Sequence, residues 1–193
     1  MARKGRAAVA HFAGGSGAGP APKMSSVAST ADHPRPAGHG LVLVRWRLTR
    51  DEDSRAPVEG WPPPVESEGL WANPAGEGRY RVANTPWFAM GLATGDVVEA
   101  VEYEGTRWVM GRAQWSGHLT VRVAHRDPAA VLGAFADLGV RGESAAPAYE
   151  IAALDIPPEA DLRPIRARLR TGRSDGTWDF EEACVSAEWR DGS

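Results

Sequence analysis

Residues 118–123 alternate strictly between polar and apolar side chains, and this pattern constrains the fold more than any other feature of the chain. Because successive side chains of a β-strand point to opposite faces, His118, Thr120 and Arg122 should share one face of a strand. The three aliphatic residues between them should share the other face, which must pack against another layer. The segment therefore predicts a sheet covered by helices on one side, with imidazole, hydroxyl and guanidinium groups on its second side.

These three polar side chains are the candidate ligand-binding residues. A row of His118, Thr120 and Arg122 suits an anionic or hydrogen-bonding ligand, because guanidinium and imidazolium groups form strong hydrogen bonds with anions. An ordinary solvated strand face is the alternative interpretation, since the open face of an antiparallel sheet is commonly polar. His125 lies seven residues after His118 and so on the opposite face, which argues against a two-histidine metal site.

Before this strand, residues 40–117 contain short segments rich in β-branched and aromatic residues, separated by polar turns. The strand candidates are residues 41–48, 68–72, 79–83, 97–103 and 106–110. Glu104-Gly105 separates the last two and is a plausible two-residue hairpin connection. The unit 40–117 is predicted to form a small antiparallel sheet or partial barrel.

From residue 118 to residue 187 the pattern changes to strand, helix, strand, helix, strand. Asp127-Pro128 is typical of a helix start, with a side-chain acceptor at the cap and proline at the first helical position. A second helix is expected to begin near Asp161, and residues 176–185 to close the unit as a strand that turns helical near Glu181. This order predicts a ferredoxin-like split β-α-β half that forms one compact body with the preceding unit, and the class is α+β.

Residues 1–38 are rich in Gly, Ala, Pro and Ser and have no sustained apolar period, so we expect a disordered tail. A secretory signal is disfavoured by the short, interrupted apolar run after Arg6, and a translation start at Met24 stays open. The tail holds five basic residues against Asp32, which leaves 17 basic and 24 acidic residues in the body, a net charge of −7. Such a body is a poor partner for phosphate backbones, so nucleic acid is not the expected partner.

Several functional classes are disfavoured by composition and by missing motifs. One Cys among 193 residues excludes an internal disulfide framework and a Cys-rich zinc module. There is no apolar run long enough to span a membrane, no phosphate-binding Gly-Lys-Ser/Thr loop, no His-Glu-x-x-His and no nucleophile elbow. We therefore expect no cofactor and no metal, and no residue is assigned a catalytic role.

Other polar and aromatic residues have a structural interpretation first. Trp87 and Phe88 are expected to plug a core, since aromatic side chains dominate protein interiors. Cys184, between Ala183 and Val185, is expected to be a small buried hydrophobe. A set of carboxylates could serve as acids or bases, but sequence separation does not give their distances. They are Glu143, Glu150, Asp155, Asp179, Glu181 and Glu182.

Five segments, taken in order, resemble a family of uncharacterised bacterial proteins that share the domain of unknown function numbered 4265. They are Tyr80-Arg-Val-Ala-Asn-Thr-Pro-Trp-Phe88, Gly95-Asp-Val-Val98, Ser116-Gly-His-Leu-Thr-Val-Arg122, Ala153-Leu-Asp-Ile-Pro157 and Gly176-Thr-Trp-Asp-Phe-Glu-Glu-Ala-Cys184. The resemblance spans roughly residues 65–185 and implies a bacterial cytoplasmic protein without an established activity. The family commonly has Gly-His-Ser-Thr where this chain has Gly117-His-Leu-Thr120. Leu119 thus replaces the serine, which disfavours a hydroxyl nucleophile at that position.

Three functions follow as hypotheses. The first is a binding or regulatory module that engages a protein or a small anionic ligand through His118, Thr120 and Arg122. The second is an enzyme of unknown reaction type with His118 as general base and Arg122 holding an anion. The third is an immunity or antitoxin-like protein whose acidic body meets a basic toxin.

Overall fold

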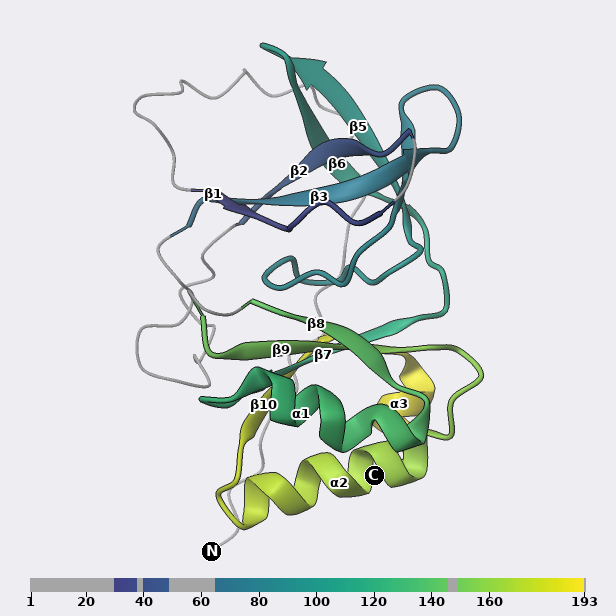
Figure 1. The fold of residues 1–193 in the computed structure, drawn as a ribbon. Helices are drawn as coiled ribbons and strands as arrows, with labels where there is room; N and C mark the ends of the chain where they lie inside the picture. The colour runs from purple at the N-terminus through teal and green to yellow at the C-terminus, as the bar shows by residue number, and fades with distance from the viewer. Residues whose placement is uncertain (1–29, 38–39, 49–64, 146–148, 193) are drawn as a thin grey trace, which may run out of the picture.

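The computed structural model describes residues 30–37, 40–48, 65–145 and 149–192. Within these ranges the fold is mixed α+β, with ten strands divided between two sheets (Figure 1). The described residues include no helix long and apolar enough to cross a bilayer. The α+β class predicted from the strand and helix pattern is confirmed.

The first sheet contains six strands in the order β1-β3-β2-β6-β5-β4 and closes on itself through an additional pairing of β3 with β4. Its strands are β1 (Thr30–Asp32), β2 (Val42–Arg47), β3 (Ser67–Pro74), β4 (Arg79–Val82), β5 (Val97–Tyr103) and β6 (Thr106–Gln114). The β1–β3 and β2–β6 pairs are parallel and the others antiparallel. All five strands predicted in this region are present. Glu104 and Gly105 both have positive φ, as a tight two-residue hairpin turn requires.

The second sheet has the order β10-β7-β9-β8, with every neighbouring pair antiparallel. Its strands are β7 (Leu119–Ala124), β8 (Arg141–Ser144), β9 (Ile151–Ile156) and β10 (Asp179–Cys184). Helices α1 (Pro128–Phe135) and α2 (Leu162–Ser174) cover one face of this sheet (Figure 1). The chain runs β7-α1-β8-β9-α2-β10, so the sequence pattern missed strand β8, which is only four residues long and lies at the sheet edge.

The helix boundaries follow from local capping. The Asp127 side chain accepts a hydrogen bond from Ala130 N and Pro128 is the first helical residue of α1, as predicted. The Asp161 side chain caps α2 in the same way. The predicted helical turn near Glu181 is wrong, because β10 stays extended to Cys184 and the short helix α3 (Ala187–Asp191) begins only after the cap at Ser186.

The loop between β4 and β5, residues 83–96, lies between the two sheets, and we call it the inter-sheet loop (Figure 1). Trp87 and Phe88 of this loop are buried in one cluster with Ala31 of β1 and with Ile151 and Ala153 of β9. They therefore pack against both sheets, and the prediction that they plug a core is confirmed.

The predicted tail boundary at residue 38 is wrong for residues 30–37. Strand β1 pairs in parallel with β3, and His33 is buried. These few residues carry no apolar period, so only their tertiary contacts order them. The rest of the predicted tail, and the Pro-rich connection at 49–64, lie outside the described residues.

Two helix glycines allow a matched test of the packing on the second sheet. An added Cβ at Gly172 of α2 would lie 2.2 Å from Trp178 Cε2, whereas nothing lies within 4 Å of one at Gly133 of α1. Gly172→Ala should lower the free energy of unfolding by about 1–3 kcal/mol, because a packed indole must move. Gly133→Ala should raise that free energy by about 0.5–1 kcal/mol. Urea unfolding of both variants measures the difference, and equal effects would contradict the packing.

Candidate functional site

Strand β7 has the two faces predicted for it. Leu119, Val121 and Val123 are buried in the main core of the second sheet, together with residues of α1 and α2. The opposite, polar face is directed toward the inter-sheet loop, where its side chains bond residues 89–92. The alternation therefore predicted the correct side for residues 119–123, whereas His118 lies just before the first residue of β7. Tertiary packing decided which segment covers the polar side.

The side chains of Thr120 and Arg122 are buried and bond other residues of the protein. The expectation that they face a ligand together with His118 is therefore wrong for these two residues. Thr120 is fully buried and its hydroxyl donates to Leu92 O at 3.1 Å. Arg122 is 4% exposed, and its Nη2 lies 3.4 Å from Ala89 O, to which it donates. Its Nη1 pairs with Glu181 Oε2 at 3.1 Å. Burial lowers the pKa of the Arg122 guanidinium, against the opposing effect of the negative charges of Glu181 and Glu68.

His118 differs from these two residues because its side chain is 27% exposed. Its Nδ1 lies 2.7 Å from Asp155 Oδ1, on the neighbouring strand β9. Because an ionised carboxylate only accepts, Nδ1 is the ring nitrogen that donates to Asp155, and this contact does not involve Nε2. Of the three predicted ligand residues, His118 alone is positioned for acid–base chemistry at the surface.

The most highly connected polar group in the described structure is the Glu68 carboxylate of β3. Its side chain is fully buried and accepts backbone hydrogen bonds from three consecutive residues of the inter-sheet loop. Trp87 N lies 2.6 Å from Oε1, and Phe88 N and Ala89 N lie 3.0 and 2.7 Å from Oε2. A buried carboxylate is tolerated only when paired and hydrogen-bonded, and here the loop backbone supplies the donors.

His33 connects this carboxylate to the second sheet. Its Nε2 lies 2.6 Å from Glu68 Oε1, and its Nδ1 lies 2.9 Å from Glu143 Oε2 on β8. The imidazole also stacks on Trp87, with ring centroids 3.6 Å apart. Burial lowers the pKa of His33, but hydrogen bonds and charges from Glu143 and Glu68 outweigh it, so the pKa is raised above its ordinary value. We call His33, Glu68 and Glu143 the His33 network.

The sequence patterns do not identify the His33 network. His33 falls within the predicted tail, and Glu143 is one of several scattered carboxylates. One sequence feature could have indicated Glu68. It lies two and four residues before Leu70 and Ala72, which line the core of the first sheet, and so its side chain points to the same side of the strand. A carboxylate at an inward position must have a buried partner. His33 lies 35 residues from Glu68 and 110 residues from Glu143, so no local pattern names the partners.

The far end of the inter-sheet loop is held by a second buried carboxylate, Asp96. Its Oδ1 accepts from Ser116 N at 2.7 Å, and its Oδ2 accepts from Ala93 N at 3.0 Å. Arg112 Nη1 lies 3.4 Å from Oδ2. The Asp96 carboxylate therefore joins the turn that leads into β5 to the segment that leads into β7.

Two observations concern metal-ligating and thiol groups. Within the described ranges no three His, Cys, Asp or Glu side chains are grouped to hold a metal ion. Cys184 is buried, and burial raises its thiol pKa despite the nearby Arg112. This agrees with its interpretation as a small buried residue.

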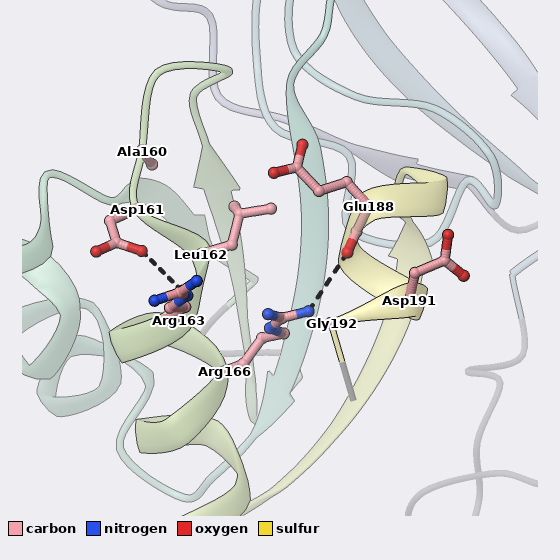
Figure 2. Close-up of a pocket in the computed structure, with 8 residues that line it drawn as sticks. All are labelled: Ala160, Asp161, Leu162, Arg163, Arg166, Glu188, Asp191 and Gly192. Atoms are coloured by element: carbon pink, nitrogen blue, oxygen red, sulfur yellow. Dashed lines mark hydrogen bonds between the residues drawn. The ribbon is translucent and has the colours of Figure 1, made fainter.

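A pocket of about 720 Å³ lies between the start of α2 and α3 (Figure 2). Its polar groups largely bond the protein itself: Asp161 caps Arg163 N, and Arg166 Nη1 donates to the carbonyls of Glu188 and Trp189. The pocket is lined by Ala160, Asp161, Leu162, Arg163, Arg166, Glu188, Asp191 and Gly192. The arginines of α2 are thus partly used in structural contacts.

Glu68→Gln tests the anchoring role of the buried carboxylate. The amide nitrogen that this substitution introduces would face hydrogen-bond donors, so we expect the free energy of unfolding to fall by about 3 kcal/mol. Glu66→Gln, at an exposed position two residues earlier, should change it by less than ~0.5 kcal/mol. Chemical denaturation at pH 7 measures both, and a Glu68→Gln protein as stable as the Glu66→Gln protein would contradict the anchoring role.

Comparison with known proteins identifies a similar structure and a matching family. The chain is similar in structure to a protein from Neisseria gonorrhoeae described as a novel crystal structure of a hypothetical protein, with a TM-score of 0.59 and 17% sequence identity. The match covers 75% of this chain and 96% of that chain, and at this identity it shows the fold alone. No curated protein matches the sequence. The family model for the domain of unknown function DUF4265 matches residues 68–180, more than half of the chain, and the protein therefore belongs to that family.

Proposed function

We propose that this protein is a binding module that holds an acidic protein segment on the outer face of its first sheet. The outer face consists of Arg45, Arg47, Val101, Tyr103 and Trp108. This assignment keeps the binding-module hypothesis but moves its surface away from β7, whose buried polar residues contact the inter-sheet loop. The observation that carries the proposal is the combination of arginine and exposed aromatic and aliphatic side chains on this outer face.

Strand register brings the outer face together. Trp108 of β6 pairs with Arg45 of β2 on one side and with Val101 of β5 on the other. Paired residues point to the same side of a sheet, and Arg47 and Tyr103 follow two positions along their strands. Val44, the residue before Arg45, is fully buried in the core of this sheet, and Trp46, between Arg45 and Arg47, packs against that core. The five outer-face residues therefore point away from the core.

The outer face has the composition of a protein interface. Val101 and Tyr103 are 52% and 47% exposed, and Arg47 is also exposed. The Arg47 guanidinium lies 5.1 Å from the Trp108 ring centroid. Stacking holds the planar guanidinium while its N–H groups remain available to a carboxylate. Aromatic residues and arginine are enriched at the centres of protein interfaces, where a few of them provide most of the binding energy.

An acidic protein segment fits this surface better than a nucleic acid. One or two carboxylates can pair with Arg45 and Arg47, and neighbouring apolar side chains can cover Val101 and Tyr103. A nucleic acid would bring a continuous row of phosphates toward a body with a net charge of −7. The choice of a protein partner therefore rests on local charge together with exposed apolar area.

The second sheet acts as the scaffold in this proposal. We interpret it as a ferredoxin-like half, which its β-α-β-β-α-β connectivity and its antiparallel order β10-β7-β9-β8 support. A bacterial origin and a cytoplasmic location, which the family resemblance implies, belong to the same proposal.

The binding proposal is tested with a random copolymer of glutamate and tyrosine as the acidic probe. Arg47→Glu should weaken probe binding about tenfold or more, because it removes the stacked cation and adds repulsion. Arg170→Glu, an equal charge change at an exposed position of α2, should leave binding unchanged. Isothermal titration calorimetry of the full chain measures both, with circular dichroism as the check on folding.

Two results would overturn the binding proposal. One is equal probe binding by the Arg47→Glu and Arg170→Glu proteins. The other is tighter binding of a single-stranded oligothymidylate than of the copolymer, which would make the surface a nucleic-acid site.

A second candidate function, general acid–base catalysis, is favoured by the contact of His118 with Asp155. A carboxylate that orients an imidazole while Nε2 stays accessible is the arrangement that a general base requires. If the protein hydrolyses activated esters or phosphate esters, His118→Asn should reduce the rate about 10²–10⁴-fold. His125→Asn is the matched control. A rate that is equal in the His118→Asn and His125→Asn proteins would remove this candidate.

A further inference from the structure

We propose that residues 30–35 form a pH-sensitive strap along the outer face, locked while both ring nitrogens of His33 are protonated and released when the imidazole loses a proton. This inference rests on the proposed function, because the strap would regulate access to that same face. The strap contains β1 and the three residues after it.

The strap already places a carboxylate on the outer face. Asp32 Oδ1 and Oδ2 lie 2.9 and 3.1 Å from Arg45 Nη1 and Nη2, a two-point contact of the kind that a partner carboxylate would make. Asp32 pairs in register with Gly69 of β3, where an added Cβ would lie 2.4 Å from Asp32 Oδ1. The absence of a side chain at Gly69 is what lets Asp32 lie across β3. Asp32 therefore competes with an acidic partner for Arg45.

The strap also covers an indole beside the outer face. The Arg35 guanidinium lies 4.9 Å from the Trp71 ring centroid, and Trp71 Nε1 donates to His33 O at 3.0 Å. Trp71 pairs in register with Leu43 of β2, two positions before Arg45, so its ring lies on the same side of the sheet. Release of the strap would thus free Arg45 and uncover Trp71, which enlarges the binding surface.

Besides the His33 network, the strap is held by its ladder with β3, by the Asp32–Arg45 ion pair and by the contacts of Trp71 with the strap. Strand β1 has three residues and one neighbouring strand, and its Thr30 and Asp32 side chains are exposed. Ala31 is its buried apolar residue. A three-residue edge strand is weakly held by its ladder alone, so the buried imidazole that follows it supplies much of the anchoring.

The geometry fits a doubly protonated His33 between two ionised carboxylates. Both oxygens of Glu68 accept backbone N–H groups, and Glu143 Oε1 accepts Thr85 N, so these carboxylates act as acceptors. An ionised carboxylate offers no proton, and therefore both ring nitrogens of His33 must donate. Loss of one proton would leave a nitrogen lone pair facing a carboxylate oxygen in a buried site, which is strongly unfavourable.

Three elements pack against the His33 ring, and two of them contribute charged side chains. Glu68 of β3 and Glu143 of β8 contact the imidazole directly, and the inter-sheet loop contributes the uncharged Trp87 ring. A further cation, Arg122 of β7, acts electrostatically on Glu68, while Asp32 on the strap is paired with Arg45. The Glu143 side chain is 33% exposed and links the buried imidazole to solvent.

The direction of the switch follows from the pKa of His33, which is raised above its ordinary value near ~6.5 because contacts with Glu143 and Glu68 outweigh burial. A raised pKa means that the folded state binds the proton more tightly than the unfolded chain. The stabilisation is therefore complete below about pH 6.5 and is lost as the pH rises through the folded-state pKa. The strap is released on the alkaline side.

The experiment follows the Ala31 methyl group and the His33 ring by NMR in the full chain between about pH 6 and pH 10, a range that brackets a raised imidazole pKa. The Ala31 methyl, which is buried, should move to its unfolded-chain position in step with the His33 titration. Binding of the glutamate–tyrosine copolymer should rise about fivefold over the same range, because Arg45 loses its internal carboxylate.

Three variants separate the parts of the proposal. His33→Gln has a single donor group that does not titrate, so its strap should be released even in mildly acidic buffer and show no pH dependence. Asp32→Asn should keep the strap locked and still bind the copolymer more tightly in that buffer, which tests the competition even if His33→Gln fails to fold. His125→Gln, just after the end of β7, should behave as the unsubstituted chain.

Each result decides one part. An Ala31 methyl that stays packed throughout the His33 titration would overturn the strap. Release of the strap with unchanged binding, while Arg47→Glu still weakens binding, would overturn the regulation and leave the proposed function standing. If the copolymer binds at no pH, the proposed function fails, and the methyl signal alone then decides whether the strap is released.

Discussion

The buried carboxylate of Glu68 is the interaction on which this architecture depends. It binds three successive backbone N–H groups of the inter-sheet loop and the imidazole of His33, which in turn contacts Glu143 of the second sheet. A charge in a protein interior is stable only when its surroundings supply donors in fixed positions. One side chain of β3 therefore determines the path of the loop and the position of the first strand.

The same physical logic explains the polar face of β7. Thr120 and Arg122 carry groups suited to a ligand, and they bind the carbonyl groups of the inter-sheet loop. Asp96 holds the other end of that loop through its contact with Ser116 N. The space between the sheets thus contains polar contacts, where carboxylates bind N–H groups and donors bind carbonyls, beside the apolar cluster of Trp87 and Phe88. We therefore propose the arginine–aromatic outer face of the first sheet, and not the polar face of β7, as the surface that binds a partner.

Local patterns predicted the elements whose cause is local. The caps at Asp127 and Asp161, the hairpin turn at Glu104 and the two faces of β7 each follow from a few neighbouring residues. The edge strands β1 and β8, of three and four residues, were missed because neither segment has a sustained alternation of polar and apolar side chains, and their pairing partners order them. The candidate site was predicted only in part, since a strand's polar side can meet either solvent or another segment of the protein.

By itself, the sequence determined the α+β class, the family, the periods of the longer strands and both major helices, because side-chain spacing and capping act within a few residues. Tertiary structure alone decided that His33 joins Glu68 and Glu143, since 35 and 110 residues separate it from these partners. It also decided that Arg122 faces the protein's own loop. Contacts of that kind depend on how the two sheets pack against each other. The free energy of that packing comes from many residues of both sheets, so no short sequence pattern predicts it.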